Sequence, residues 1–285
     1  MASDSRFAVL IDADNVSVKY IKIILDEISK DGIATYKRIY GDWTNPSLIS
    51  WKSTLLDNSI IPIQQYSYTT GKNSTDSAMI IDAMDILYSG RVEGFCLVSS
   101  DSDFTRLAAR LRESGMTVIG MGESKTPNSF IAACNKFKYL DILSAADEEE
   151  LEEAAAPKAE PVKKAAQPKK AAPKAAKKPK EEPKAEKEKP AETKKQQEKA
   201  IEEPRTSLRT IRRSLRTIVR ENSDEDNWIM VSQVGNLLDK RYPDFDVRNF
   251  GFSKLTPFLE SLDLFEIKDL KKDGNSYAQK YVRLK

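Results

Sequence analysis

Aspartates follow two apolar runs of the sequence, and their placement suggests a site that binds a positively charged ligand. The run Phe95 to Val98 ends in Ser99-Ser100-Asp101-Ser102-Asp103, and the run Phe7 to Ile11 ends in Asp12-Ala13-Asp14-Asn15. A continuous apolar run is typical of a buried parallel strand, and apolar residues at helical spacing follow each group of acids. Ligands of open α/β sheets bind beyond the carboxyl ends of the strands. We therefore expect the two groups of acids to share one site.

Another aspartate, Asp76, stands in the first turn of an expected helix. It precedes the apolar face of that helix at i+3 and i+4 spacing. Ser74 or Thr75 can cap the helix, which leaves Asp76 free to point into the site. Asp82 and Asp85 fall elsewhere on the helix, where we expect solvated or salt-bridged roles.

The acids Asp12, Asp76, Asp101 and Asp103, with Asn15 beside them, can crowd together only if a cation neutralises them. Oxygen ligands without histidine or cysteine suit Mg²⁺ or Mn²⁺ better than Zn²⁺. Such an ion lowers the pKa of a bound water and stabilises the charge that develops on a phosphodiester. A simpler role as helix cap stays open for Asp14 or Asn15.

Several other kinds of protein are excluded by composition. The 285 residues contain no histidine, so neither a Ser-His-Asp nor a Cys-His mechanism is available. The two cysteines form no CxxC pair, so the sequence indicates neither a zinc site nor a disulfide framework. Gly120 and Gly122 do not follow the first strand in a GxGxxG pattern, so a dinucleotide-binding fingerprint is not supported. Because there is no apolar run of membrane-spanning length and no signal-peptide pattern, we expect a cytoplasmic protein without membrane contact.

Residues 1–145 alternate between strand and helix patterns. Further strands are expected at 34–40, 60–66, 116–122 and 137–140, with short helices near 47–57 and 129–134. This alternation predicts an α/β domain with a Rossmann-like, doubly wound parallel sheet.

The composition changes twice after this domain. Residues 146–204 repeat Ala, Lys, Pro and Glu with almost no large apolar side chain, which predicts a disordered linker. The pattern of residues 205–285 predicts three helices, near 205–220, 228–238 and 252–259, and a hairpin of 264–267 with 277–284. This order predicts a small winged-helix α+β domain.

Basic residues of the winged helix mark a surface for phosphates. The first helix carries apolar residues on one face and, on another, the arginines Arg205, Arg209, Arg212, Arg216 and Arg220. Five arginines without interleaved acids favour a nucleic-acid contact over an ordinary solvated face. Further candidates for phosphate contacts are Arg248 and Lys254 in the same domain and Lys72 and Lys125 near the acids.

Three motifs of the first domain resemble a known family. The segments IDADN (Ile11 to Asn15), KNSTD (Lys72 to Asp76) and VSSDSDF (Val98 to Phe104) are similar to those of the NYN domain, a branch of the PIN-like nucleases that includes LabA-like proteins. The resemblance implies a metal-dependent ribonuclease fold. It implies Asp12, Asp76 and Asp101 as metal ligands, supported by Asn15 and Asp103.

The last domain resembles the LOTUS or OST-HTH domain. The resemblance is carried by VSQVG (231–235), YPDFD (242–246), NFGFSKL (249–255) and the closing YVRL (281–284). It implies a winged helix that binds RNA or a protein partner.

Two functions follow from these readings. The first is an Mg²⁺- or Mn²⁺-dependent endoribonuclease whose winged helix recruits RNA, with DNA open as a substrate. The second is a catalytically weak RNA-binding regulatory adaptor. A phosphatase is disfavoured, because Asp12-Ala13-Asp14 lacks the rest of that signature.

Overall fold

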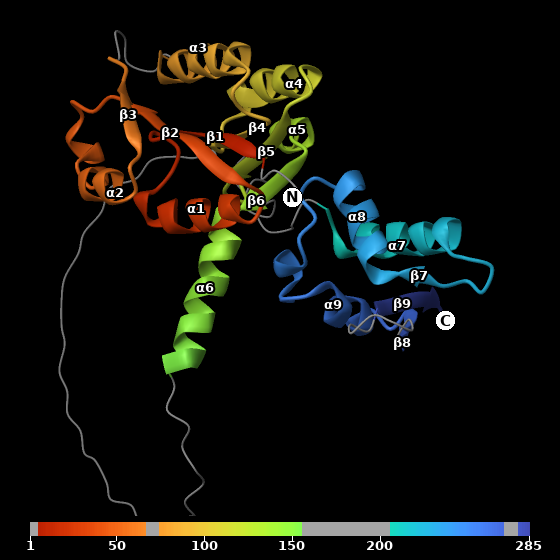
Figure 1. Cartoon of the computed structure of the whole chain (residues 1–285). Coiled ribbons are helices and arrows are strands. Elements are labelled where there is room, and N and C mark those ends of the chain that lie inside the picture. The colour runs from red at the N-terminus through yellow and green to blue at the C-terminus, as the bar shows by residue number, and fades with distance from the viewer. Residues whose placement is uncertain (1–4, 67–73, 156–205, 271–278) are drawn as a thin grey trace, which may run out of the picture.

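The computed structural model describes residues 5–66, 74–155, 206–270 and 279–285. They form two modules, an α/β domain and a smaller α+β domain (Figure 1). Most of the predicted linker, together with Lys72 and Arg205, lies outside the described residues. None of the described helices combines the length and apolar character needed to cross a bilayer.

The first module is built on a six-stranded parallel sheet with strand order β3-β2-β1-β4-β5-β6. This is the doubly wound order, in which the chain turns back at β1 and β4 and opens a crevice between their carboxyl ends. The strands are β1 (Arg6–Asp12), β2 (Ile33–Gly41), β3 (Ile61–Gln64), β4 (Gly94–Val98), β5 (Thr117–Gly122) and β6 (Lys136–Tyr139).

Alternate residues of β1 face two separate cores. Phe7, Val9 and Ile11 pack on one side of the sheet with α1 (Ile21–Ser29), α2 (Trp51–Asp57) and α6 (Leu140–Ala155). Ala8 and Leu10 pack on the other side with α3 (Ser74–Ser89), α4 (Thr105–Glu113) and α5 (Asn128–Ala133). The two layers of helices are seen above and below the sheet in Figure 1. By the same alternation, Asp12 faces the side of α3.

Two elements differ from the prediction. Helix α6 continues to Ala155, ten residues past the expected end of the domain at 145. In the second module, Ile229–Met230 forms a strand, β7, where we expected the start of a helix. The reason is pairing, because Ile229 and Met230 lie opposite Val282 and Tyr281 of the last strand. The wing is therefore a three-stranded sheet of order β7-β9-β8.

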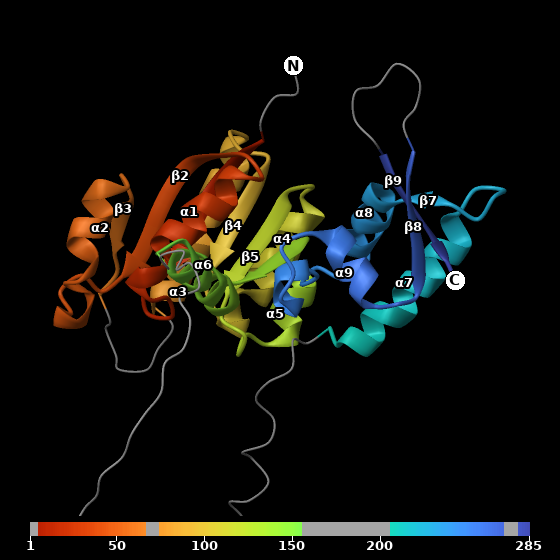
Figure 2. The same cartoon turned by 90° about the horizontal axis from the view of Figure 1, so that it is seen from below.

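The second module is otherwise a winged helix, as predicted. Its helices are α7 (Leu208–Asn222), α8 (Val231–Arg241) and α9 (Leu255–Ser261), and its hairpin is β8 (Phe265–Leu270) with β9 (Gln279–Leu284). Leu215, Val234, Phe258 and Val282 are fully buried at its centre. The module lies beside the parallel sheet (Figure 2), and it contacts the edge strand β6, where the Phe137 N–H donates to Pro243 O.

Candidate functional site

Asp12 ends β1 as an almost fully buried carboxylate, 1% exposed. Its Oδ2 accepts hydrogen bonds from Asn15 Nδ2 at 2.7 Å and Ser99 Oγ at 2.8 Å, and its Oδ1 accepts one from the Asp14 backbone N–H at 3.1 Å. Burial raises the pKa of Asp12, and these hydrogen bonds partly oppose that effect. The carboxylate is therefore held in one orientation at the crevice between β1 and β4.

The loop after β4 is held by hydrogen bonds of its own. Ser99 donates its backbone N–H to Met121 O at 3.0 Å, and Ser99 Oγ accepts from the Asp101 N–H at 3.0 Å. Asp101 then caps the following turn, since its Oδ1 accepts from the Asp103 N–H at 2.9 Å. Ser99 thus connects the end of β1 to the acidic loop.

Asp76, Asp101 and Asp103 form a trio whose carboxylate oxygens lie within 4.8 Å of one another. Asp76 comes from the first turn of α3, while the other two follow β4. Burial, and then the charges of Asp12, Asp101, Asp103 and Asp14, raise the pKa of Asp76 to about 6. A divalent cation bound by oxygen would relieve this repulsion, and three carboxylates are a fitting ligand set for Mg²⁺ or Mn²⁺.

The structure distributes the predicted site residues differently from the expected ligand set. Asp103, expected to support the metal ligands, contributes an oxygen to the trio, whereas Asp12, expected to be a ligand, is not among its members. Asp12 is nevertheless near, because its charge contributes to the raised pKa of Asp76. Asn15 is exposed and bonds Asp12.

Two residues of the site were not singled out from the sequence. Ser99 bonds Asp12, and its only sequence signal is a hydroxyl directly after a buried strand. Gly122 ends β5 where a Cβ would lie 2.7 Å from Ser99 O and 2.7 Å from Thr126 Oγ1. A glycine inside a strand is the signal for such a close approach.

Asp82, on the same helix as Asp76, has the salt-bridged role expected for it. It forms an ion pair with Arg38 and accepts a hydrogen bond from Tyr40 Oη. Burial and the neighbouring Asp82 carboxylate raise the pKa of Tyr40 above its usual range. Because Asp82 is neutralised by its own partner, it fixes α3 against β2.

The arginines of α7 are displayed on one exposed face. They line a shallow depression together with Thr217. Arg212 also donates from Nη2 to Leu262 O at 3.3 Å, which holds its guanidinium beside α9. Arg213, which we did not single out, belongs to the same surface. We call this surface the α7 arginine face; its residues are Arg209, Arg212, Arg213, Arg216 and Arg220.

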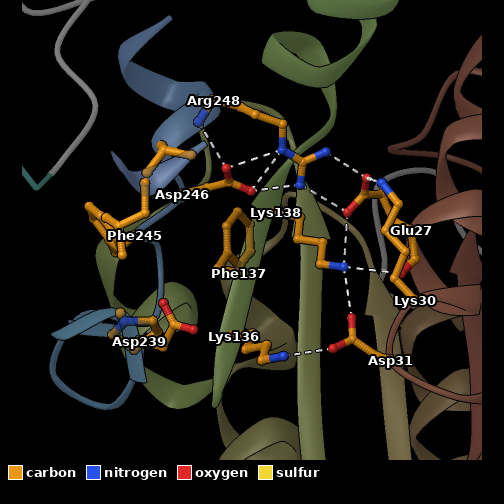
Figure 3. A pocket seen from close by; sticks show the side chains of 14 residues that line it. Glu27, Lys30, Asp31, Lys136, Phe137, Lys138, Asp239, Phe245, Asp246 and Arg248 are labelled. Atoms are coloured by element: carbon orange, nitrogen blue, oxygen red, sulfur yellow. Dashed lines mark hydrogen bonds and ion pairs between the residues drawn. The ribbon is translucent and has the colours of Figure 1, made fainter. Parts of the chain in front are cut away.

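The other basic candidates differ in setting. Lys254 is exposed just before α9, and Lys125 is exposed and pairs with Glu123 at 2.7 Å. The guanidinium of Arg248 instead binds two carboxylates, those of Asp246 and Glu27, where the two modules meet (Figure 3). Its donors are directed to these acids, so we do not include Arg248 in the RNA-binding surface proposed below.

Two family models match the chain, one over each module. The NYN domain family matches residues 6–141, and the OST-HTH/LOTUS domain family matches residues 206–277. One similar solved structure is that of a protein of unknown function from Vibrio parahaemolyticus RIMD 2210633. The match covers 49% of this chain and 94% of the Vibrio chain, with 17% sequence identity and a TM-score of 0.42. No curated protein matches the chain.

The first of these families is nuclease-like and the second binds RNA, which supports a nuclease or RNA-associated role. Residues 6–141 thus match an NYN domain and residues 206–277 an OST-HTH/LOTUS domain, in that order along the chain.

Proposed function

We propose that this protein is a metal-dependent endoribonuclease that cleaves RNA phosphodiesters at the trio Asp76, Asp101 and Asp103. The observation that carries the proposal is the convergence of three carboxylate oxygens at the crevice of an NYN sheet. Acids crowded together at a ligand-binding edge are better explained by a bound cation than by fold stability, because their mutual repulsion opposes folding.

A bound Mg²⁺ or Mn²⁺ would supply a water of lowered pKa and stabilise the charge on the phosphodiester as it is displaced. The trio would hold the ion, and Asp101 would be fixed in place by its hydrogen bond from the Asp103 N–H. Asp12, held at the end of β1 by hydrogen bonds from Asn15 and Ser99, would help to orient the trio.

RNA would be recruited through the α7 arginine face, supported by Lys254. Lys125, and from the sequence Lys72 and Arg205, remain proposed phosphate contacts. Guanidinium groups suit this role because they bind phosphate oxygens in pairs and stay charged at all physiological pH values. We further propose a cytoplasmic location, since Cys96 and Cys134 are both free and buried.

The test is cleavage of a labelled single-stranded RNA, and of the matching DNA, with Mn²⁺, Mg²⁺ or chelator. We expect metal-dependent cutting by the wild type and a loss of at least a hundredfold in Asp101→Asn. The matched control is Asp85→Asn, an exposed aspartate of α3 outside the trio, which should cut like the wild type. Equal cutting by wild type and Asp101→Asn would refute the assignment.

A second candidate, a regulatory adaptor that binds RNA without efficient cleavage, is favoured by one observation. Asp12 is buried and hydrogen-bonded to Asn15 and Ser99, and it is not a member of the trio. Salt-sensitive RNA binding without metal-dependent cutting would support this alternative.

A further inference from the structure

The contact between the two modules contains a network of ion pairs. Glu27 of α1 is 3% exposed, and its carboxylate accepts from Arg248 Nη1 at 2.6 Å and Nη2 at 3.0 Å. Lys138 of β6 approaches the same carboxylate at 2.9 Å, and Lys30, the C-cap residue of α1, also pairs with it (Figure 3). One acid of the NYN domain therefore holds an arginine of the winged helix.

Neighbouring acids complete this network. Arg248 Nη2 also donates to Asp246 Oδ2 at 2.6 Å, while Lys138 and Lys136 bind Asp31 at 2.8 and 2.6 Å. Burial alone would raise the pKa of Glu27, but hydrogen bonds from its cationic partners hold that pKa well below its usual range. The network thus stays charged and directional at neutral pH, which favours one relative placement of the modules.

A second contact lies at the carboxyl end of β6. The Phe137 N–H donates to Pro243 O at 2.7 Å, so the edge strand is joined to the winged helix through its backbone. Asp244 is buried and accepts from Tyr139 Oη at 3.2 Å and from Thr206 Oγ1 at 2.6 Å. It thereby connects the last residue of β6 to the residue that precedes the cap of α7.

This contact places the start of α7 at the same edge of the sheet as the acidic trio. Parallel strands β4, β5 and β6 are consecutive neighbours, so β6 lies about 10 Å across the edge from β4, which leads to Asp101. From there α7 runs away from the sheet, as both views show (Figures 1 and 2). RNA lying along the α7 arginine face would therefore lead toward the acids.

We propose that the ion network docks the winged helix as an arm that sets the reach between bound RNA and the acidic trio. The proposal rests on the proposed nuclease function. The span from Arg209 to Arg220 is about 16 Å at 1.5 Å per helical residue. With the roughly 10 Å across the sheet edge, the path from Arg220 to the end of β4 is about 26 Å, or roughly eight stacked nucleotides at about 3.4 Å each.

The substrate class that follows is single-stranded RNA longer than about eight nucleotides, cut at a set distance from the segment bound by α7. The experiment compares kcat/KM for a 5-nucleotide and a 20-nucleotide RNA in the full chain. We expect the wild type to prefer the long RNA by at least tenfold. Arg248→Glu, which sets an acid against Glu27 and Asp246, should reduce that preference to less than threefold and scatter the cleavage positions.

Arg241→Glu is the matched control, because Arg241 is exposed on α8 and the change in charge is the same. Docking is followed separately by small-angle scattering, in which Arg248→Glu should expand the chain and Arg241→Glu should not. Tyr139→Phe, which removes the hydroxyl bound to Asp244, provides a milder second variant if Arg248→Glu does not fold.

The outcomes separate the two proposals. An expanded Arg248→Glu that keeps the wild-type length preference and cleavage positions overturns the arm while leaving the nuclease intact. An Arg248→Glu that folds and does not expand overturns the docking itself. A wild type that does not cut RNA overturns the nuclease and with it the arm, while the scattering comparison still decides whether Arg248 docks the winged helix.

Discussion

Replacing Asp76 by asparagine should stabilise the protein when no metal is bound. The pKa of Asp76 is raised from 3.8 to about 6 by burial and by the surrounding acids. A group with a raised pKa binds its proton more tightly in the folded state, so the folded state is penalised when the proton leaves. Asparagine keeps the shape of the side chain and removes the charge.

The size of the effect follows from the shift. About two pKa units at about 1.4 kcal/mol each set an upper limit near 3 kcal/mol at pH 8. Because Asp76 is only partly buried, solvent screening reduces the expected gain to about 1–2 kcal/mol. The gain should fall to about half at pH 5, between the unfolded and folded pKa values, and disappear below about pH 4.

The assay is denaturant unfolding of wild type and Asp76→Asn in chelator, at pH 8 and pH 5. Asp85→Asn on the same helix is the control and should change stability by less than about 0.5 kcal/mol. Adding Mn²⁺ should reverse the order, since a cation at a hundred times its dissociation constant stabilises the wild type by about 2.7 kcal/mol and the variant by much less. A variant that is less stable than wild type in chelator at pH 8, or a difference that does not change with pH, would refute this reasoning.

Three further predictions concern the supports of the site and the RNA surface. Ser99→Ala removes a donor to the buried Asp12 and should lower the free energy of unfolding by about 1–3 kcal/mol, measured by denaturant. Gly122→Ala should cost a similar amount and weaken the stabilisation by Mn²⁺, because its Cβ would press on the backbone of Ser99; unchanged metal stabilisation would contradict this. Neutralising Arg209, Arg212 and Arg216 of the α7 arginine face should reduce the slope of log affinity for single-stranded RNA against log salt concentration by about 2. An unchanged slope would mean that RNA binds at another surface.

The centre of the parallel sheet was predictable because β1, β4 and β5 are buried along most of their length, on both faces. Such strands appear as apolar runs, and the acids that interrupt them mark the carboxyl ends where a ligand binds. The strand order, with β1 beside β4, is not encoded in any local pattern, yet it is what brings Asp12 close to Ser99. The common edge of the acids could thus be predicted, but not their exact distances.

The roles within the acidic group were harder to predict. Asp12 and Asp103 look alike in sequence, since each stands in an Asp-x-Asp segment after an apolar strand. Asp12 is the last residue of β1 and is buried, whereas Asp103 stands five residues beyond the end of β4 and is exposed. A difference of a few residues in where a strand ends decides which acid enters the trio.

The role of Arg248 could not be found from the sequence at all. In a basic module, an arginine in a loop is typical of a phosphate contact. Its partner Glu27 lies 221 residues earlier in the chain, on the apolar helix α1. A pairing across domains leaves no trace in local composition or spacing.

Glu27 and Asp76 show how the same chemistry serves two purposes. Cations surround Glu27 in the structure, so its charge is neutralised within the protein and its pKa falls. The neighbours that act most on Asp76 after burial are all acids, so they oppose its negative charge and its pKa rises. An acid neutralised by its own chain fixes the fold, whereas an acid crowded by other acids stores a repulsion that a bound cation can relieve. For this reason we assign Glu27 to docking and Asp76 to the metal, although both are acids on helices that flank the same sheet.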